Sequence, residues 1–568
     1  MKQTLNTKRD LKQIDLSARG EPFLWTMGGA LVLGVMMIVG FVLLIFWNGI
    51  VTFYPKPLVK VMLDSRKILA GEIHRTETVR LENHLFQELD EKSRTFVNKN
   101  KGYANRTLYK IGNYDLYNED FKWVADYEVN TISQPENLYY FERVEWGPFI
   151  GTIDSLQLDS RVIKPDGEIS SILADEHKKA VARRRTIEKI EKDEISEISY
   201  RLEKERLALK RIGMETGRDA TEYHEADKDY QAHLADMSLL YQKLQKKADR
   251  IKTTNQLYTI TLREVEGKTK TIKLSDLVRF YPANSISFTQ KMGIYFSRWA
   301  EFLTAEPREA NTEGGVMPAI FGTVIMTLLL VVFVAPFGIM ASLYLREYAR
   351  QGILVSVVRV CVNNLAGVPS IVYGVFGLGF FAYILGGSID SLFFPEKLPS
   401  PTFGTGGLLW AALTLALLTV PVVIVATEEA LASVPQSLRE GSLACGASKW
   451  QTIKNIVLPK ALPGILTGLI LAMARGAGEV APLMLVGVVK LAPELPLDGH
   501  FPYIHLERSF MHLGFHIFDV GFQSRNSEAG KPMVFVTTLL LIALIAVMNA
   551  FAIYIRNRLN RKYASDHF

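Results

Sequence analysis

The stretch that decides the fold is VPQSLREGSLACGASKWQTIKNIVLPKALPGI, residues 434–465, which separates two long apolar segments. Pro435 is of a residue type that begins helices, and Gly446 can take the left-handed backbone conformation that ends them. The pattern predicts a short helix over 438–445 and a second helix over 449–458, limited by the two prolines that follow. We expect this helix–turn–helix to be exposed at one face of a membrane.

Apolar stretches on both sides of this loop are long enough to cross a membrane, which takes about 20 mostly apolar residues. A stretch between Lys460 and Lys490 contains only Arg475 and Glu479 as internal charges. Five further stretches contain no charged residue at all: 22–55, 314–345, 360–389, 398–427 and 532–555. Six transmembrane helices are therefore expected, the first over 23–55. A cleaved secretory signal is the alternative for that first stretch, but signals have apolar regions of only about 7–15 residues, so we predict a retained anchor.

Basic residues indicate how these helices are oriented. The N-terminal segment 1–22 contains five Lys or Arg residues, the tail 556–568 contains four, and the connection 346–352 contains two arginines. Because basic residues concentrate on the cytoplasmic side, we expect both termini to be cytoplasmic. The long segment 56–312 then lies outside, which is the periplasm if the membrane is the inner membrane of a Gram-negative bacterium.

Composition excludes several kinds of chemistry. A net charge of +6 gives no case for nucleic-acid binding, and the only cysteines, Cys361 and Cys445, form no CxxC pair. The sequence contains neither the GxxxxGK[ST] phosphate loop nor the HExxH zinc motif. We therefore expect a chain that is not itself an enzyme, with no metal site and no bound cofactor.

The segment 56–312 is predicted to be a separate domain of α+β type. Short β-prone runs fill residues 71–171, and 255–274 is typical of a β-hairpin that turns near Gly267. Between them, 175–251 is highly charged and helical in pattern. Its second half has apolar residues at coiled-coil spacing, and its first half has a similar series with a slip near residue 195. The heptad residues are Tyr230, Leu234, Met237, Tyr241, Leu244, Ala248 and Ile251.

A break at GMETGRD, residues 213–219, divides this helical region into halves of similar length. We therefore expect an antiparallel helical hairpin standing on the β domain. The hairpin has two possible roles, which are pairing within the chain for stability and docking of another protein. Nothing in its sequence indicates catalysis.

The loop quoted first carries a family resemblance. Glu440, Gly446, Ile456, Leu458 and Pro459 fit the pattern E-A-A-x3-G-x9-I-x-L-P, which resembles the cytoplasmic loop of ABC importer permeases. That loop, here 434–463, implies a short helix that docks into a groove on a separate ATPase subunit. Small residues replace the two usual alanines. The residues implied to form the coupling loop are Arg439, Glu440, Gly441, Ser442, Ala444, Gly446, Ala447, Ile456, Leu458 and Pro459.

Wider stretches are similar to one family of such permeases. PFGIMASLYLREYAR, AGVPSIVYGVFGLG and MARGAGEVAPLM, in this order, resemble the PstA-type permease of the phosphate-specific transporter, over about 311–562. The resemblance implies an all-α membrane protein of the type I ABC importer permease fold, with six transmembrane helices and its core at 313–555. It implies a heterodimer with a PstC-type permease, two PstB-type ATPase subunits that bind ATP and Mg, and a PstS-type phosphate-binding protein. The insert at 56–312 belongs to an extended subgroup.

Two charges at membrane depth are the main candidates for the substrate path. Arg475 and Glu479 are four residues apart, so on a helix they share one face. A guanidinium can donate two parallel hydrogen bonds to a tetrahedral oxyanion, and a carboxylate can neutralise it when the path is empty. The alternative is a pair that only neutralises itself inside the membrane. Asn364 and Ser370, in a Pro- and Gly-interrupted span, are weaker candidates that could equally bond a neighbouring helix.

Remaining charges have less specific interpretations. We expect Glu428 and Glu429 to be solvated at the cytoplasmic end of the fourth span. Four histidines in the loop 491–531 would form a metal site only if they converged, and solvated or aromatic-packed side chains are the alternative. These are His500, His505, His512 and His516.

The sequence favours a permease subunit of an ATP-driven importer of inorganic phosphate, working by alternating access in the lipid bilayer of a bacterial inner membrane. Three other classes stay open. They are an ABC permease for another oxyanion or small solute, an ATP-independent channel or transporter, and a signalling or scaffold protein that uses the outer helices.

Overall fold

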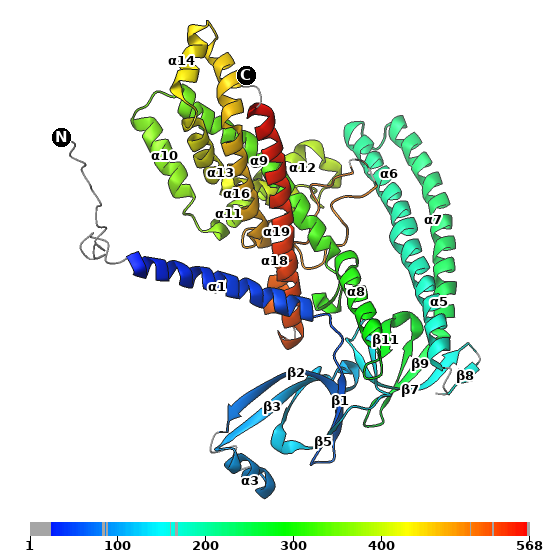
Figure 1. The fold of residues 1–568 in the computed structure, drawn as a ribbon. Coiled ribbons are helices and arrows are strands. Elements are labelled where there is room, and N and C mark those ends of the chain that lie inside the picture. The colour runs from blue at the N-terminus through cyan, green and yellow to red at the C-terminus, as the bar shows by residue number, and fades with distance from the viewer. Residues whose placement is uncertain are drawn as a thin grey trace, which may run out of the picture.

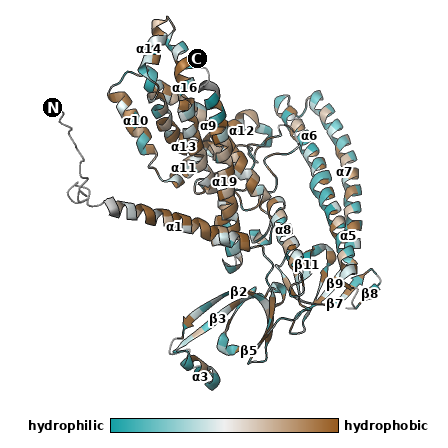
Figure 2. Cartoon of the chain, viewed as in Figure 1, coloured by the Kyte–Doolittle hydropathy of each residue, from teal (hydrophilic) through white to brown (hydrophobic). Residues whose placement is uncertain are grey.

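The chain forms a bundle of apolar helices and a β-rich insert domain that follows the first helix (Figure 1). This computed structural model describes residues 24–564, apart from 82–85, 87–88, 160, 165–168, 500, 502 and 525–526. The N-terminal segment 1–22 lies outside the described residues. Figure 2 shows the hydropathy contrast between the two parts, because the bundle is largely brown and the insert helices are largely teal.

Within the described ranges, six helical spans are long and apolar enough to cross a membrane. They are Thr26–Val51, Met317–Tyr348, Ser370–Phe393, Leu408–Ala432, Lys449–Gly478 and Ser527–Arg561. The helices that build them are α1 (Leu24–Val51), α9 (Met317–Leu343), α11 (Ser370–Phe376), α12 (Gly387–Phe393), α13 (Leu408–Ala432), α15 (Lys449–Thr452), α16 (Leu458–Gly478) and α19 (Ser527–Ala564). Three π-helical segments complete them: η6 (Tyr344–Tyr348), η7 (Gly377–Gly386) and η9 (Ile453–Val457).

The third span differs from the expected continuous stretch 360–389. A separate helix, α10 (Ile353–Leu365), ends before it, and α11 begins only at Ser370. Pro369 explains the break, because proline has no amide hydrogen and disfavours helical backbone at the residue before it.

The fifth span differs at both of its ends. Its helix begins at Lys449 and passes Pro459 without stopping, because Pro459 lies in the first turn of α16, directly after the π segment η9, and a first turn tolerates proline. The helix then ends at Gly478, where Glu479 takes an extended backbone conformation with ψ 132°. The apolar residues that follow form only the short helix α17 (Leu483–Val486). The stretch up to Lys490 is therefore not one spanning helix.

Helix α13 is the centre of the bundle and packs against both α9 and α16. Its neighbours approach closely where small residues face it; a Cβ on Gly338 of α9 would lie 2.5 Å from Val423. α19 packs on α16 and on the end of α1, where Gly49 faces Leu539. The rest of α1 has exposed apolar side chains (Figure 2), so most of its surface needs lipid or another subunit as a neighbour.

The insert domain contains two antiparallel sheets. One has the order β4-β3-β2-β1-β5, and the other has the order β10-β9-β7-β6-β11 with β8 beside β7. The first comprises β1 (Leu58–Leu63), β2 (Ile68–Arg80), β3 (Tyr103–Lys110), β4 (Phe121–Ala125) and β5 (Val129–Ser133). The second comprises β6 (Tyr139–Arg143), β7 (Phe149–Leu158), β8 (Arg161–Ile163), β9 (Tyr258–Arg263), β10 (Thr269–Lys273) and β11 (Leu277–Pro282). Gly267, at φ 98°, turns the β9–β10 hairpin where the sequence placed it.

A helical hairpin rises from the second sheet beside the bundle (Figure 1). Its first arm runs through α5 (Ile169–Lys189), the π segment η3 (Ile190–Ile195) and α6 (Ser196–Glu215), and α7 (Thr221–Gln256) returns. The π segment lies at the slip in the apolar pattern, because an i→i+5 turn inserts one residue and rotates the stripe. Of the α7 heptad positions Ala248 is buried, Tyr241 is 40% exposed and the others are half-buried, so the apolar seam is only partly covered.

The insert rejoins the bundle through α8 (Phe288–Thr304) and the small β12–β13 pair, at Pro307–Arg308 and Glu313–Gly314. Glu309, Ala310 and Asn311, just before α9, all have positive φ angles. Such a run is strained for residues with a Cβ. It persists because its side chains are held: Glu309 accepts from the Trp146 amide at 2.7 Å, and Asn311 donates to Asp519 at 2.9 Å.

Candidate functional site

The loop between α13 and α16 forms a short exposed helix, α14 (Gln436–Ala444). Gly446 has φ 83°, so it adopts the left-handed conformation that the sequence predicted, and its amide bonds back to Leu443 at 3.0 Å. Ser448 then caps α15 in a reciprocal arrangement with Gln451. The sequence therefore encodes both the end of one helix and the start of the next.

Arg439 fastens α14 to the ends of two spans. Its Nη2 atom donates to the Leu431 carbonyl of α13 at 2.6 Å and lies 3.1 Å from Oε1 of Glu347, at the end of the second span. The Lys449 ammonium lies 4.9 Å from the Tyr348 ring centroid. Arg439 and Lys449 thus link the α14 loop to the end of the second span and to α13. Sequence reasoning missed Glu347, because it counted only the arginines of REYAR and not the acidic residue between them.

The residues predicted for this loop divide into two groups. Glu440, Gly441, Ala444 and Gly446 are exposed, and a Cβ on either glycine would contact nothing within 4 Å. The others are at least partly buried and hold the loop together, with Ser442 Oγ 2.9 Å from Thr452 Oγ1. That second group comprises Arg439, Ser442, Ala447, Ile456, Leu458 and Pro459. Exposed Leu443 and Trp450 extend the free surface.

Arg475 and Glu479 lie together at the C-terminal end of the fifth span, although not as the sequence suggested. Glu479 is outside α16, and Arg475 Nε lies 3.9 Å from its Oε1 atom. Their side chains are 39% and 25% exposed. A separation of 3.9 Å is longer than a hydrogen bond, so the pair is loose, and both groups are accessible on a face that this chain leaves open.

The two interrupted spans meet just after Glu479, because a Cβ on Gly374 of α11 would lie 2.8 Å from the Cα of Pro482. The hydroxyl of Tyr373, also in α11, donates to the Leu365 carbonyl at 2.6 Å, across the break between α10 and α11. Asn364 and Ser370 flank this break. In the part of the chain that the structure describes, no hydrogen bond or ion pair joins either of them to Arg475.

One of the two glutamates at the end of the fourth span differs from the expectation that both are solvated. Glu429 is exposed as expected, whereas Glu428 is half-buried and pairs with Arg359 of α10 at 3.4 Å. Both glutamates line a cavity of about 200 Å³ with Asn363. Glu428 differs because α10 folds back on α13 and covers it.

The histidines of the outer loop are buried rather than solvated. His505 lies between Asp498 at 2.9 Å and Glu507 at 3.1 Å. Burial lowers the pKa of both His512 and His516 to about 4, so both are neutral at pH 7. His500 lies outside the described residues. Among those described, no group of three or more His, Cys, Asp or Glu side chains could hold a metal ion.

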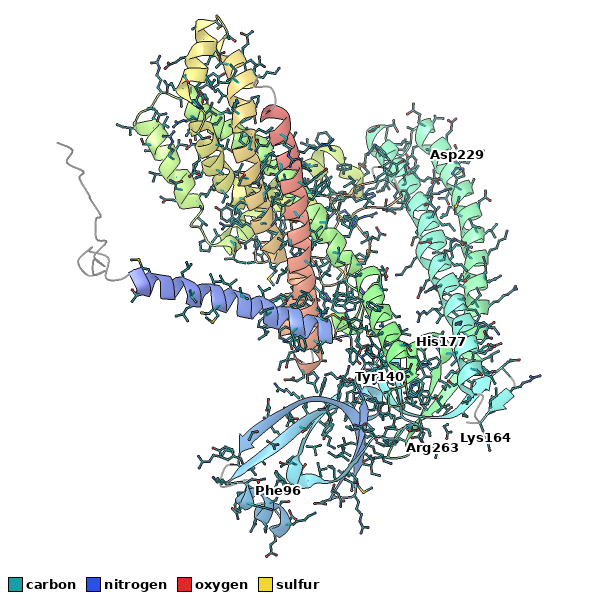
Figure 3. All side chains as sticks on the ribbon, viewed as in Figure 1. Phe96, Tyr140, Lys164, His177, Asp229 and Arg263 are labelled. Carbon is teal, nitrogen blue, oxygen red and sulfur yellow. The ribbon has the colours of Figure 1, made fainter. Side chains whose placement is uncertain are left out.

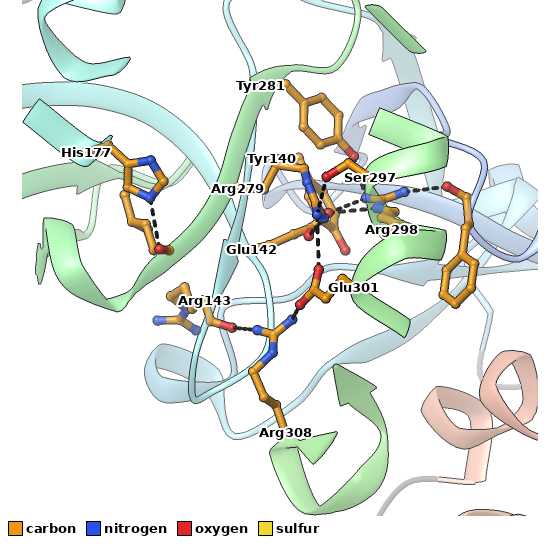
Figure 4. Close-up of polar contacts among 12 residues, drawn as sticks. Tyr140, Glu142, Arg143, His177, Arg279, Tyr281, Ser297, Arg298, Glu301 and Arg308 are labelled. Atoms are coloured by element: carbon orange, nitrogen blue, oxygen red, sulfur yellow. Dashed lines mark hydrogen bonds and ion pairs between the residues drawn. The ribbon is translucent and has the colours of Figure 1, made fainter. Parts of the chain in front are cut away.

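A buried ionic network joins the insert domain to the bundle (Figure 4). Glu142 of β6 accepts from Arg298 of α8 at 2.8 and 2.5 Å and also binds Arg279. Arg279 and Arg308 both bind Glu301. Arg298 reaches the Phe53 carbonyl at the end of α1, at 3.0 Å. Figure 3 shows Tyr140 at this junction, far from Asp229 on the hairpin. No sequence pattern indicates this network, because its members come from four separate segments.

Comparison with known proteins places the bundle in a family. Residues 335–561 match the family described as "Binding-protein-dependent transport system inner membrane component". The chain is 30% identical over 256 residues to the probable ABC transporter permease protein YqgI of Bacillus subtilis, which covers 43% of this chain and 81% of that protein. It is 35% identical over 240 residues to the phosphate transport system permease protein PstA of Mycobacterium leprae, covering 42% and 69%.

PstA 1 of Mycobacterium tuberculosis is 42% identical over 175 residues, which is 31% of this chain and 51% of that protein. The chain thus spans between about half and four-fifths of the length of these relatives. The family match begins after the insert domain and includes both the α14 loop and Arg475. The chain therefore belongs to the family of binding-protein-dependent transport system inner membrane components, and is a permease of the PstA type.

Proposed function

We propose that this chain is the membrane-spanning, non-catalytic permease subunit of an ATP-driven importer of inorganic phosphate. One observation carries the proposal: the exposed loop around α14 continues directly into the span that ends beside an accessible arginine, Arg475. The surface proposed to bind the ATPase and the arginine proposed to bind the anion thus lie at the two ends of the same span. The relatives named as phosphate permeases support phosphate as the anion.

The proposed mechanism is alternating access driven from the α14 loop. A separate ATPase, which binds ATP and Mg, receives α14 in a groove. Its closure moves α9 and α13 through Arg439, and moves α16 through α15 and η9. Arg475 donates two parallel hydrogen bonds to the phosphate. Glu479, at 3.9 Å, holds Arg475 loosely between cycles, so the anion displaces it at little cost.

The family suggests the partners, and each can be assigned to a surface that the chain leaves open. We assign a PstC-type permease to the open face that exposes Arg475, a pair of PstB-type ATPases to the α14 loop, and a PstS-type binding protein to the outer side. Asn364 and Ser370 supply weaker donors to the path. All six spans cross a bacterial inner membrane, with both termini cytoplasmic and residues 56–312 on the outer side.

Uptake by the purified complex in proteoliposomes tests the proposal. Labelled phosphate should accumulate only with ATP inside and binding protein outside, and sulfate should not compete. Accumulation of another solute in place of phosphate would make the chain a permease for that solute. Uptake that persists without ATP hydrolysis would make it an ATP-independent transporter.

A further inference from the structure

The insert domain contacts the bundle at two places that are far apart in the sequence. Its root is the network around Glu142, which binds the ends of α1 and α8, and Arg75 of β2 adds a contact 3.0 Å from Glu528 at the start of α19. The root therefore holds the outer ends of the first, second and sixth spans.

The second contact is made by the upper part of the hairpin. Arg211 of α6 forms an ion pair with Glu396, and Lys210 donates to the Leu398 carbonyl at 2.8 Å. Glu396 lies in the 3₁₀ turn η8 (Pro395–Lys397), which follows the third span. The hairpin thus reaches from the β sheets back to the bundle and is not a free arm.

The third span has two irregular segments at which its conformation can change. It begins at the α10–α11 break, and its middle is the ten-residue π segment η7; π segments are rare in helices and mark functional sites. Many of its side chains are exposed, such as Val375 and Tyr383. Its first turns pack against the segment that follows Glu479, because a Cβ on Gly374 would lie 2.8 Å from the Cα of Pro482. A contact that fixes the outer end of this span therefore acts on the element next to the anion site.

We propose that the insert domain is a strap across the outer face of the permease, and that the contact between Arg211 and Glu396 is its releasable end. When closed, the strap holds the third span in the conformation seen here. When it opens, the third span is free to rearrange relative to the first, second and sixth spans. The strap rests on the proposed function only in that the spans move during an ATP-driven cycle, whatever the solute.

The hairpin contact opens in preference to the root because it is the weaker of the two. At the root, several arginines and glutamates share bonds, and the Glu142, Arg279 and Arg298 side chains are 12–15% exposed. At the hairpin, Arg211 is 53% exposed and forms the only ion pair with Glu396 among the described side chains, with the charge of the adjacent Lys397 acting on Glu396 as well. Water can therefore solvate Arg211 as it leaves.

Glu396 makes the closed contact specific. Its side chain is 3% exposed, and its Oε2 atom has no hydrogen-bond partner within the described chain. Burial is the largest influence on the pKa of Glu396 and raises it, but the bond and charge of Arg211, a backbone hydrogen bond and the Lys397 charge together hold that pKa below its ordinary value. A buried carboxylate without its cation is unfavourable, so the strap closes again whenever Arg211 is within reach.

Charge reversal tests the strap in the full complex with its ATPase, without binding protein. Arg211→Glu opens the contact, and the double variant Arg211→Glu with Glu396→Arg restores an ion pair of opposite polarity. Arg218→Glu, in the hairpin turn, is the matched control, because it makes the same charge change away from the contact. We expect Arg211→Glu to raise basal ATP hydrolysis at least about fivefold, the low end of typical coupling between sites. The double variant should return towards the wild-type rate, and the control should not differ.

A distance measurement tests the contact without ATP hydrolysis. Spin labels at Asp219→Cys and Ser400→Cys, with Cys361 and Cys445 replaced by serine, report the separation of the hairpin from the connection after the third span. We expect a narrow distribution that broadens in Arg211→Glu and narrows again in the double variant. Unchanged distributions in Arg211→Glu would overturn the contact. Broadened distributions with an unchanged hydrolysis rate would overturn its role as a strap, while leaving the phosphate assignment intact.

Discussion

Two glycines of the α14 loop allow two requirements to be tested separately, the backbone conformation of the loop and its docking onto an ATPase. Gly446 has φ 83°, and a Cβ there would meet nothing within 4 Å. The cost of Gly446→Val is therefore conformational alone, at least about 1–2 kcal/mol for a left-handed L-residue. That lowers the population of the correctly turned loop by about 5–30-fold. Gly446→Asn should cost less, because asparagine tolerates this conformation.

Gly441 gives the complementary test. It lies within helical backbone in open space, so Gly441→Leu should leave the isolated chain folded and strengthen α14 by about 0.8 kcal/mol, since leucine is a better helix former than glycine. If α14 packs closely against an ATPase groove, the added side chain collides with that partner. Gly441→Leu should therefore abolish coupling despite a more stable helix.

Two assays distinguish these effects. Hydrogen exchange over residues 436–452 should increase in Gly446→Val, increase less in Gly446→Asn, and stay the same or decrease in Gly441→Leu. ATP-dependent uptake should fall in Gly446→Val and Gly441→Leu, at wild-type abundance in the membrane. Normal uptake by Gly441→Leu would refute close docking of α14, and normal uptake by Gly446→Val would refute the need for the turn.

Three further predictions concern contacts that the structure makes visible. Glu347→Ala should lower the stability of the bundle by about 3 kcal/mol, because it leaves the Arg439 charge without a carboxylate, and a double-mutant cycle of thermal unfolding with Arg439→Met should show most of that cost as coupling. Arg298→Met should lower the free energy of unfolding by roughly 3–5 kcal/mol, because it leaves the buried Glu142 carboxylate without this cation. Limited proteolysis should then cleave the insert domain faster than in the wild-type protein. Burial lowers the pKa of both His512 and His516 from 6.5 to about 4, so stability should be full above pH 6.5 and fall by about 3 kcal/mol for each histidine as pH drops towards 4. His512→Phe should remove about half of the fall that these two histidines cause.

The sequence predicted best where one local rule decides the structure. Runs without charge located the apolar spans, and Gly446 and Gly267 located two turns, because only positive φ suits those positions. The slip near residue 195 coincides with the π segment η3, because helical periodicity records inserted residues.

The failures have a common cause in tertiary context. Charge counting treated 461–489 as one span, although Gly478 and Pro482 divide it, so Glu479 is not on the helical face of Arg475. Glu428 was predicted to be solvated, but Arg359 of α10 pairs with it. The networks around Glu142 and Glu396 join segments more than a hundred residues apart, and no spacing rule for a single segment can reveal such contacts.

The central claim is that Arg475 binds the transported anion, and one measurement tests it most directly. Labelled phosphate uptake by the reconstituted complex should be compared between Arg475→Gln and Arg556→Gln, which removes a half-buried arginine of α19 whose only visible partner in the described chain is Thr467. Loss of charged hydrogen bonds worth about 1.5–3 kcal/mol should reduce uptake by Arg475→Gln at least about tenfold, while Arg556→Gln retains it. Wild-type uptake by Arg475→Gln, at equal abundance in the membrane, would contradict the account and make the Arg475–Glu479 pair purely structural.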